Sequence, residues 1–347
     1  MTEDSADIDT DSLANLRLIG HDAAQGIFLD SVTSGRTAHA WLLAGPRGIG
    51  KTILARRMAA RVLSGDDGQS ALFDTPATAW EPSPSDPATI KVAHGTHPDL
   101  LIVTRVADEK TGKLQKEISV AAIRRVSAFL RLTPADGGWR AVIIDSADDM
   151  NRNAANALLK ILEEPPADVL LVLVSHAPHD LLPTIRSRCR QLPLLPLSAD
   201  ATQRVLAAEA ANATAEDIAL ATRLAGGCPG RGIDLLRDDG LAIFREVSAR
   251  LDDLPRVDVR AVHALGDIVV RAKEDRPFHR VFETLEWWLS DTIRGLATGA
   301  SGRGGLEQWL EVWDKVHRLH RRTESANLDR KQAIIRAFNL LEAAARP

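Results

Sequence analysis

The 347-residue chain contains little of what several protein classes require. It has no tyrosine, 4% aromatic residues and two cysteines, Cys189 and Cys228. So few aromatic rings argue against binding single-stranded nucleic acid by base stacking, and two cysteines cannot form a disulfide framework or a four-cysteine zinc site. No run approaches the ~18 apolar residues of a membrane span, and the acidic start is unlike a signal peptide. The sequence therefore predicts a cytoplasmic protein with no membrane contact.

Beyond residue 13, the chain also lacks an excess of positive or negative charge. The formal net charge is −4, and residues 1–13 hold five acids and no base. The other 42 acids face 43 Lys and Arg residues, so long-range attraction to DNA is not the main feature of the chain. Hydrophobic and charged fractions of 45% and 26% are typical of a folded protein. The length predicts two or three domains.

The pattern up to residue 196 is that of an α/β protein. Residues 1–15 have the composition of an acidic tail, and residues 64–98 are rich in Ser, Asp, Pro and Gly, which predicts a loop or insertion. A short apolar strand is predicted at 41–44. Three later apolar runs, separated by helical segments, have the length and branched side chains of strands buried on both faces: 99–104, 139–145 and 168–175. This alternation predicts a parallel sheet.

The pattern after residue 196 is almost wholly helical. The glycine-rich run GGCPG at 226–230 interrupts it, and Leu254-Pro255 offers a second break. The predicted helices cover 199–211, 214–226, 231–253, 257–273, 276–297, 304–323 and 328–345.

The run GPRGIGKT predicts a phosphate-binding loop. It comprises Gly45, Pro46, Arg47, Gly48, Ile49, Gly50, Lys51 and Thr52, and it fits G-x-x-x-x-G-K-[ST] between a predicted strand and a helix over Lys51–Leu63. Backbone N–H groups would face phosphate oxygens, Lys51 would reach the terminal phosphates, and Thr52 would bind Mg²⁺. The alternative is a tight glycine turn without a ligand. We expect this loop to bind ATP with Mg²⁺.

A second apolar strand ends in Asp145, which we expect to act as a Mg²⁺ ligand or to lie just behind one. ATPases of this type usually place a glutamate next, which activates water, but Ser146 stands here. A hydroxyl cannot act as a carboxylate base at neutral pH, and the loss of a positioned base removes ~10² to 10⁴ in rate. Asp148 and Asp149 could substitute, although acids before a helix more often cap it. ATP hydrolysis by this chain is therefore expected to be absent or weak.

Two further stretches carry a family resemblance: NAANALLKILEEPP at 153–166 and TIRSRC at 184–189. Together they closely resemble clamp-loader subunits of the AAA+ family, and within it the delta-prime type of bacterial DNA polymerase III. The run LIGH at 18–21 is similar to a family motif near the adenine pocket, and the late run NLDRKQAI resembles the end of the collar. The resemblance implies three parts: an α/β AAA+ P-loop core with a parallel sheet at 16–196, a small helical lid at 197–240, and an all-helical collar for oligomerisation at 241–347.

The resemblance also implies roles for single residues. Arg188, in the SRC motif, becomes an arginine finger that enters a neighbouring subunit's ATP site, although three alternating arginines in RSRCR could be plain surface charge. Arg231 matches the lid arginine that senses the terminal phosphate, or else a surface arginine at a helix start. Ser175 occupies the position of the other polar sensor.

Two departures from the family pattern point away from its motor subunits. The motors and many delta-prime relatives carry four zinc-binding cysteines between the phosphate loop and the acidic strand, but residues 53–140 contain none. His94 and His97 alone make no zinc site, so we expect none. The motors also keep an Asp-Glu pair where this chain has Asp145-Ser146. The delta subunit, in contrast, ordinarily lacks an intact phosphate loop.

The implied function is that of a subunit in the DNA polymerase III holoenzyme during DNA replication, with no polymerase active site of its own. It would complete the loader ring with motor subunits of the gamma/tau type and a delta-type subunit, and the assembled complex would meet the sliding clamp and primed DNA. The alternatives are an ATP-hydrolysing motor subunit and, less favoured, a P-loop kinase, for which the helical half offers no acceptor site. Late basic residues are as typical of solvated helix faces as of DNA binding: Lys315, Arg318, Arg321, Arg322, Arg330 and Lys331.

Overall fold

The computed structural model describes residues 16–35, 37–64, 83, 85–106, 115–135, 138–237, 240–272, 275–299, 304–326 and 328–346. The chain divides into two compact units. The first is Met1–Leu206 with Ala225–Arg231, and the second is Ala207–Leu224 with Gly232–Pro347. The predicted acidic tail at 1–15 and residues 65–82 of the predicted insertion lie outside the described residues.

The first unit contains a five-stranded sheet in the order β2-β3-β4-β1-β5, and every pair of neighbouring strands is parallel. Its strands are β1 Ala40–Ala44, β2 Leu100–Val103, β3 Arg140–Ile144, β4 Val169–Ser175 and β5 Arg190–Pro193. The parallel α/β architecture predicted from the four apolar runs is thus confirmed. Strand β5 was not predicted, because it is a short edge strand with only Leu192 buried.

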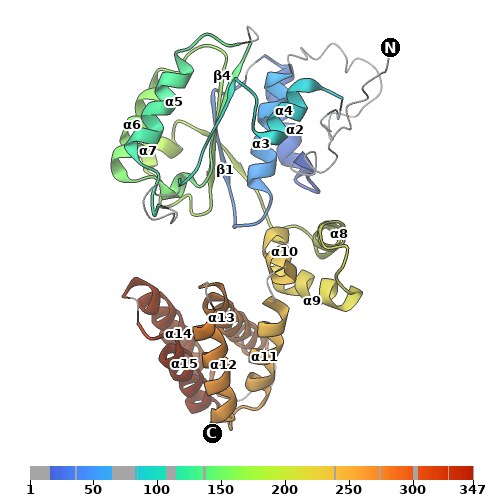
Figure 1. The fold of residues 1–347 in the computed structure, drawn as a ribbon, viewed down its shortest axis with the longest axis vertical. Coiled ribbons are helices and arrows are strands. Elements are labelled where there is room, and N and C mark those ends of the chain that lie inside the picture. The colour runs from blue at the N-terminus through green and yellow to red at the C-terminus, as the bar shows by residue number, and fades with distance from the viewer. Residues whose placement is uncertain are drawn as a thin grey trace. The chain divides into compact units, whose positions relative to one another are not determined.

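Alternate residues of the central strands enter two separate cores. In β1, Ala40 and Leu42 pack on one side of the sheet and Trp41 and Leu43 on the other. Figure 1 shows α5, α6 and α7 on one face of the sheet and α2, α3 and α4 on the other. Burial on both faces is the reason that these strands read as continuous apolar runs.

The helical segments of this unit are α2 Asp22–Thr33, α3 Lys51–Leu63, α4 Pro87–His94, α5 Val120–Leu130, the short 3₁₀ helix η3 Ala147–Asp149, α6 Arg152–Glu163 and α7 Pro183–Arg186. Helix α4 corrects the prediction of a loop across residues 64–98. The Asp86 carboxylate accepts hydrogen bonds from the backbone N–H groups of Ala88 and Thr89 at 3.3 and 2.9 Å, and Pro87 suits the first helical position. Val92 and Ala93 are buried, and α4 packs against α3. The polar composition of this stretch predicted a loop, but Asp86 caps a short helix within it.

The remaining helices are α8 Ala199–Glu209, α9 Ala215–Ala225, α10 Pro229–Arg237, α11 Gly240–Asp252, α12 Val259–Arg271, α13 Arg276–Ala297, α14 Leu306–Ser325 and α15 Arg330–Ala345. The predicted helix at 231–253 corresponds to two helices, α10 and α11. Gly240, the first residue of α11, lies so close to Leu235 that a Cβ atom on Gly240 would lie 3.0 Å from the Leu235 Cα.

The second unit has a core of its own, built by α11 to α15. The rings of Phe278 and Phe282 lie 4.9 Å apart at its centre, and Trp288 meets Trp309 edge to face at 5.4 Å. Each of the five helices contributes buried apolar side chains to this core. Across the part of the chain that the structure describes, every helix is too short or too polar to cross a bilayer.

Candidate nucleotide site and arginine finger

The phosphate loop connects β1 to α3, as predicted. Gly50, its last residue before the helix, has a φ of 105°, which is strained for any residue with a Cβ atom. Helix α3 begins at Lys51, so the unsatisfied N–H groups of its first turn lie at the end of the loop, where anions bind. The predicted family motif at 18–21 also reaches the loop, because His21 Nε2 donates a hydrogen bond to the Ile49 carbonyl at 2.8 Å.

Lys51 is buried within the loop. Its ammonium group donates hydrogen bonds to the carbonyls of Gly45 and Pro46, both at 2.6 Å. Burial lowers the pKa of Lys51 to about 8, against the opposing effect of the Asp148 and Asp145 carboxylates, which favour its charged form. The loop thus holds its lysine by two neutral carbonyl groups, which compensate its charge less well than phosphate oxygens would.

Thr52 and Asp145 come together although they lie far apart in sequence. Thr52 Oγ1 at the start of α3 donates a hydrogen bond to Asp145 Oδ1, just after β3, at 3.1 Å. Two ligands in adjacent positions of octahedral Mg²⁺ lie about 2.9 Å apart, given Mg–O distances of about 2.05 Å. The two oxygens, both of the hard donor type that Mg²⁺ prefers, therefore fit the predicted metal position. The loop and the acidic strand form one site.

The acidic turn after Asp145 corrects the prediction that Asp148 and Asp149 cap a helix. Asp148 accepts a hydrogen bond from Ser175 Oγ and another from the His176 backbone N–H, both at 2.5 Å. Asp149 forms an ion pair with Arg105 at 3.0 Å. The N-cap of α6 is instead Asn151, whose side chain accepts a hydrogen bond from the Ala154 N–H at 2.9 Å. Both acids lie in η3, which ends before Met150 and Asn151, so they bind neighbouring strands and loops and do not cap α6.

Sequence reasoning missed His176, which follows the predicted sensor Ser175 at the end of β4. Its Nε2 lies 3.1 Å from the Ser146 hydroxyl, the group that stands where a motor subunit has its glutamate. Burial lowers the pKa of His176, and the positive charge of Lys51 lowers it further, so a neutral ring is favoured at neutral pH. Its Nδ1 is buried with no hydrogen-bond partner among the described residues. The only signal in the sequence was its position beside Ser175.

The start of α10 lies against the phosphate loop, within the first unit. The Gly230 N–H donates a hydrogen bond to the Gly48 carbonyl at 2.8 Å. Neither glycine has room for a side chain: a Cβ on Gly230 would lie 2.8 Å from the Gly48 Cα, and one on Gly48 would lie 3.0 Å from the Arg231 backbone nitrogen. The structure therefore brings the backbone of Arg231, the predicted sensor, next to the loop.

Arg188, the predicted finger, follows the short helix α7. Its guanidinium forms an ion pair with Glu163 at 2.7 Å and donates a hydrogen bond to the Thr184 carbonyl at 3.1 Å. About a third of its side chain is exposed. Glu163 is the last residue of α6, the helix of the ALLKILEEPP stretch. The neighbouring Cys189 is buried, which raises the pKa of its thiol to about 12 and keeps it unreactive at neutral pH.

The affinity of the chain for ATP is expected to fall as the pH rises above about 8, the pKa of Lys51. Below that pH the free chain already carries the positive charge that phosphate requires. Above that pH, Lys51 of the free chain has lost its proton, and binding of the ATP phosphates would require Lys51 to take up a proton again. The affinity for ATP should therefore fall by up to ~10-fold per pH unit. Titration with ATP in a calorimeter at pH values from about 7 to about 9.5 measures this slope.

The control for that pH dependence is Lys51→Arg, whose charge does not titrate in this range. Its affinity should be nearly independent of pH between the same limits. If wild type and Lys51→Arg showed the same slope, a group other than Lys51 would be responsible.

A sequence model of the family described as DNA polymerase III, delta subunit, matches residues 20–198, just over half of the chain. The DNA polymerase III subunit delta' of Pseudomonas aeruginosa is 40% identical over 196 residues, 55% of this chain and 54% of that protein. The subunit of the same name from Bacillus subtilis is 33% identical over 177 residues, 51% of this chain and 48% of that protein. The chain thus spans about half the length of the curated relatives that it matches.

Among solved structures, a DNA polymerase III gamma subunit-related protein of Thermotoga maritima has a TM-score of 0.42 at 16% identity, with 92% of this chain and 100% of that chain covered. The family match includes the phosphate loop, the acidic turn and the finger motif in a single segment. Two of these relatives carry the name delta', which is the type of subunit that the motifs resemble. The chain belongs to the DNA polymerase III delta subunit family, among whose relatives it resembles those named delta'.

Proposed function

We propose that this chain is a clamp-loader subunit of the delta-prime type, which binds ATP without hydrolysing it efficiently and supplies Arg188 to a neighbouring motor subunit. It would join motor subunits of the gamma/tau type and a delta-type subunit, and the assembled ring would open a sliding clamp at primed DNA. The turn after β3 is the main support for the absence of efficient hydrolysis. In it, Ser146 follows Asp145 and lies beside His176, and Asp148 accepts hydrogen bonds from Ser175 and His176.

The phosphate loop supports ATP binding with Mg²⁺. Lys51 would exchange its two carbonyl partners for phosphate oxygens, and Thr52 and Asp145 would hold the metal, which supplies positive charge beside the β- and γ-phosphates. Arg231 would sense the terminal phosphate from the start of α10. The close contact of Gly48 with Gly230 supports this placement of the arginine.

The engaged acids argue against the motor alternative. Asp148 uses one oxygen for Ser175 and the other for the His176 backbone, and Asp149 is paired with Arg105. A general base must hold water in line with the γ-phosphate and must be free to accept its proton. Neither acid is free in that sense, and the His176 ring lies beside the hydroxyl that replaces the motor glutamate.

Arg188 is held in a way that suits a finger. Its partner Glu163 and Arg188 itself are both partly exposed, and ion pairs between such groups contribute roughly 0–1 kcal/mol. The side chain can therefore leave Glu163 at small cost when a neighbour's phosphates attract it. The Thr184 carbonyl and Glu163 together would keep the guanidinium extended until a neighbour arrives.

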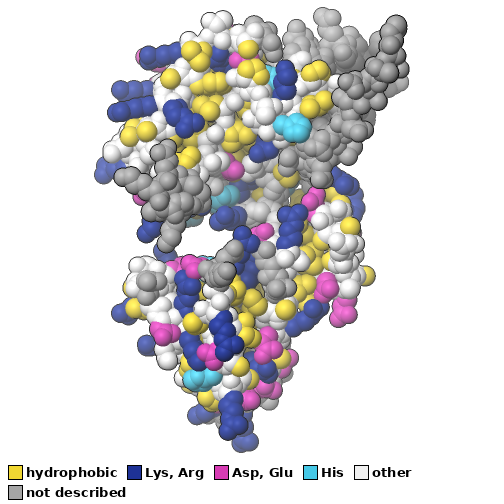
Figure 2. All heavy atoms as spheres, in the orientation of Figure 1, with side chains coloured by type: hydrophobic (Ala, Val, Ile, Leu, Met, Phe, Trp, Pro, Cys, Tyr) yellow, Lys and Arg dark blue, Asp and Glu magenta, His cyan; other side chains and the backbone are white. Residues whose placement is uncertain are grey.

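The helical second unit would provide the collar that joins this chain to its sister subunits. Four residues of its predicted basic patch are paired with acids in the structure: Lys315 with Glu311, Arg318 with Asp314, Arg330 with Asp275 and Lys331 with Asp267. Figure 2 shows basic and acidic side chains interspersed over the lower, helical part of the face in view. These pairs favour solvated helix faces over direct DNA contact, so we propose that DNA meets the assembled complex.

Reconstitution tests the assembly. Mixing the chain with motor and delta-type subunits of the same organism should give a complex of fixed stoichiometry in size-exclusion chromatography with light scattering. Loading of the sliding clamp onto primed circular DNA should require the chain. Loading at full rate by a mixture that omits it, with no complex formed when it is added, would contradict the proposal.

A further inference from the structure

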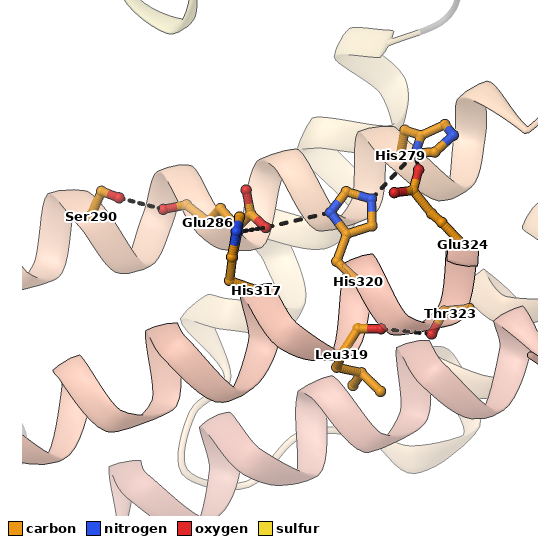
Figure 3. A network of polar contacts seen from close by, with 8 residues as sticks. All are labelled: His279, Glu286, Ser290, His317, Leu319, His320, Thr323 and Glu324. Atoms are coloured by element: carbon orange, nitrogen blue, oxygen red, sulfur yellow. Dashed lines mark hydrogen bonds and ion pairs between the residues drawn. The ribbon is translucent and has the colours of Figure 1, made fainter. Parts of the chain in front are cut away.

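Two histidines and a glutamate converge on the surface of the second unit. Among the residues that the structure describes, His279, His320 and Glu324 form a group whose potential ligand atoms all lie within 4.8 Å of one another. His279 Nδ1 lies 3.2 Å from His320 Nε2 and 3.0 Å from Glu324 Oε1. Figure 3 shows the two imidazole rings and the carboxylate turned toward one another from α13 and α14.

The placement of the three residues follows from the helices that carry them. His320 and Glu324 are one turn apart on α14, the spacing that puts two ligands on one face of a helix. His279 lies in the first turn of α13, which packs along α14. The site thus takes ligands from both helices and would join them.

The Glu286 carboxylate, next to Nδ1 of His320, fixes the direction of the lone pair on the other ring nitrogen of His320. His320 Nδ1 lies 3.4 Å from Glu286 Oε1, an oxygen that also lies 3.2 Å from His317 Nδ1. An ionised carboxylate can accept hydrogen bonds but cannot donate them. His320 therefore donates from Nδ1, and the lone pair on its Nε2 points at His279. Histidines that bind metals usually donate their other ring N–H to a carboxylate, a backbone carbonyl or water.

Packing holds the His320 ring in this orientation. The ring stacks on Phe282 with centroids 4.7 Å apart and an angle of 17° between planes, and Phe278 meets it edge-on at 5.7 Å. About 14% of the His320 side chain is exposed, against 35% for His279 and 45% for Glu324. One ligand is therefore preorganised, while the two on the solvent side can move to admit an ion.

We propose that His279 Nδ1, His320 Nε2 and a Glu324 carboxylate oxygen bind one divalent late first-row cation of the Zn²⁺ type. Ligand atoms of a tetrahedral zinc site are about 3.3 Å apart, given metal–ligand distances of about 2.0 Å, and two of the three separations here already approach that value. Two imidazoles and one carboxylate select such an ion over Mg²⁺ or Ca²⁺, which prefer all-oxygen sites. A water molecule would complete the tetrahedron.

The bound ion would fasten α13 to α14 in the unit that we assign to assembly. This inference is independent of the nucleotide site, and it does not concern the cysteine zinc site of the family, for which this chain lacks the residues. The alternative is a hydrogen bond from His279 to His320 with no metal.

Metal titration of the untagged, chelator-treated full chain tests the site. Titration with ZnCl₂ in a calorimeter should show one equivalent bound, and CoCl₂ should give the visible absorption bands of a tetrahedral Co²⁺ complex. His279→Ala and Glu324→Gln, which change partly exposed side chains, should each weaken Zn²⁺ binding by at least ~100-fold. Glu286→Gln should weaken it by ~10- to 100-fold, because it leaves the ligands in place and removes only the group that orients His320.

The matched control is His263→Ala, an exposed histidine on α12 outside the cluster. It should bind Zn²⁺ as the wild type does, and Zn²⁺ should raise the unfolding temperature of both but not of His279→Ala. Zn²⁺ binding that is absent, or equally strong in wild type, His279→Ala and Glu324→Gln, would overturn the proposal in favour of the hydrogen-bonded pair.

Discussion

Replacement of Arg188 by alanine is expected to slow ATP hydrolysis at the neighbouring subunit's site in the assembled loader by ~10³-fold or more, since a finger arginine stabilises the charge of the transition state. The variant should remain folded, because the side chain is partly exposed and its partners, Glu163 and the Thr184 carbonyl, can bond to water instead. Single-turnover hydrolysis, measured with clamp and primed DNA present, reports the loss.

Arg186→Ala is the matched control, because Arg186 is the last residue of α7, two positions before the finger. It should form the complex and hydrolyse ATP at nearly the wild-type rate. Size-exclusion chromatography verifies that both variants are incorporated. An Arg188→Ala complex with wild-type turnover at every site would remove the finger assignment and leave Arg188 as a partner of Glu163 alone.

The isolated chain is expected to bind ATP and to hydrolyse it ~10² to 10⁴-fold more slowly than a motor subunit of the same organism. The reason is the acidic turn: Ser146 has no carboxylate, and Asp148 and Asp149 are bound to Ser175, His176 and Arg105. Nucleotide occupancy by calorimetry and phosphate release from the same sample separate binding from hydrolysis.

Lys51→Ala is the control for that measurement. It should reduce ATP occupancy strongly, because it removes the charge that the loop offers to phosphate, while the low rate of phosphate release should stay at background. Rapid phosphate release by the wild-type chain alone, abolished in Lys51→Ala, would establish the motor alternative and would require Asp148 to leave Ser175 during the reaction.

The fold of the first unit was predictable where burial is complete. Strands β1, β3 and β4 are apolar along their whole length because helices cover both faces of the sheet, and the glycines of the phosphate loop mark a backbone that only glycine adopts without strain. The meeting of Thr52 with Asp145 also followed from the motif, because both residues were expected to lie at one Mg²⁺ position. The NAANALLKILEEPP stretch at 153–166 supplies most of α6, which ends at Glu163, just before Pro165 and Pro166.

Features that depend on a few polar contacts were not predictable. Strand β5 has one buried residue, and α4 depends on the Asp86 cap inside a polar stretch. Asp148, after β3, accepts hydrogen bonds from the end of the neighbouring strand β4 and from His176 just beyond it, partners that are distant in sequence, so local propensity favoured the wrong role for it. His176 and the His279–His320–Glu324 cluster likewise require the positions of separate elements, which no spacing in one segment reveals.

Helix α6 begins at Arg152, after the acidic turn and the N-cap Asn151, and it ends at Glu163, which forms an ion pair with Arg188. At about 1.5 Å per residue its twelve residues span about 18 Å. The length of α6 therefore fixes the distance between the acidic turn and the Glu163–Arg188 ion pair. Lengthening or shortening α6 by even one residue would rotate Glu163 by about 100° around the axis and aim Arg188 elsewhere.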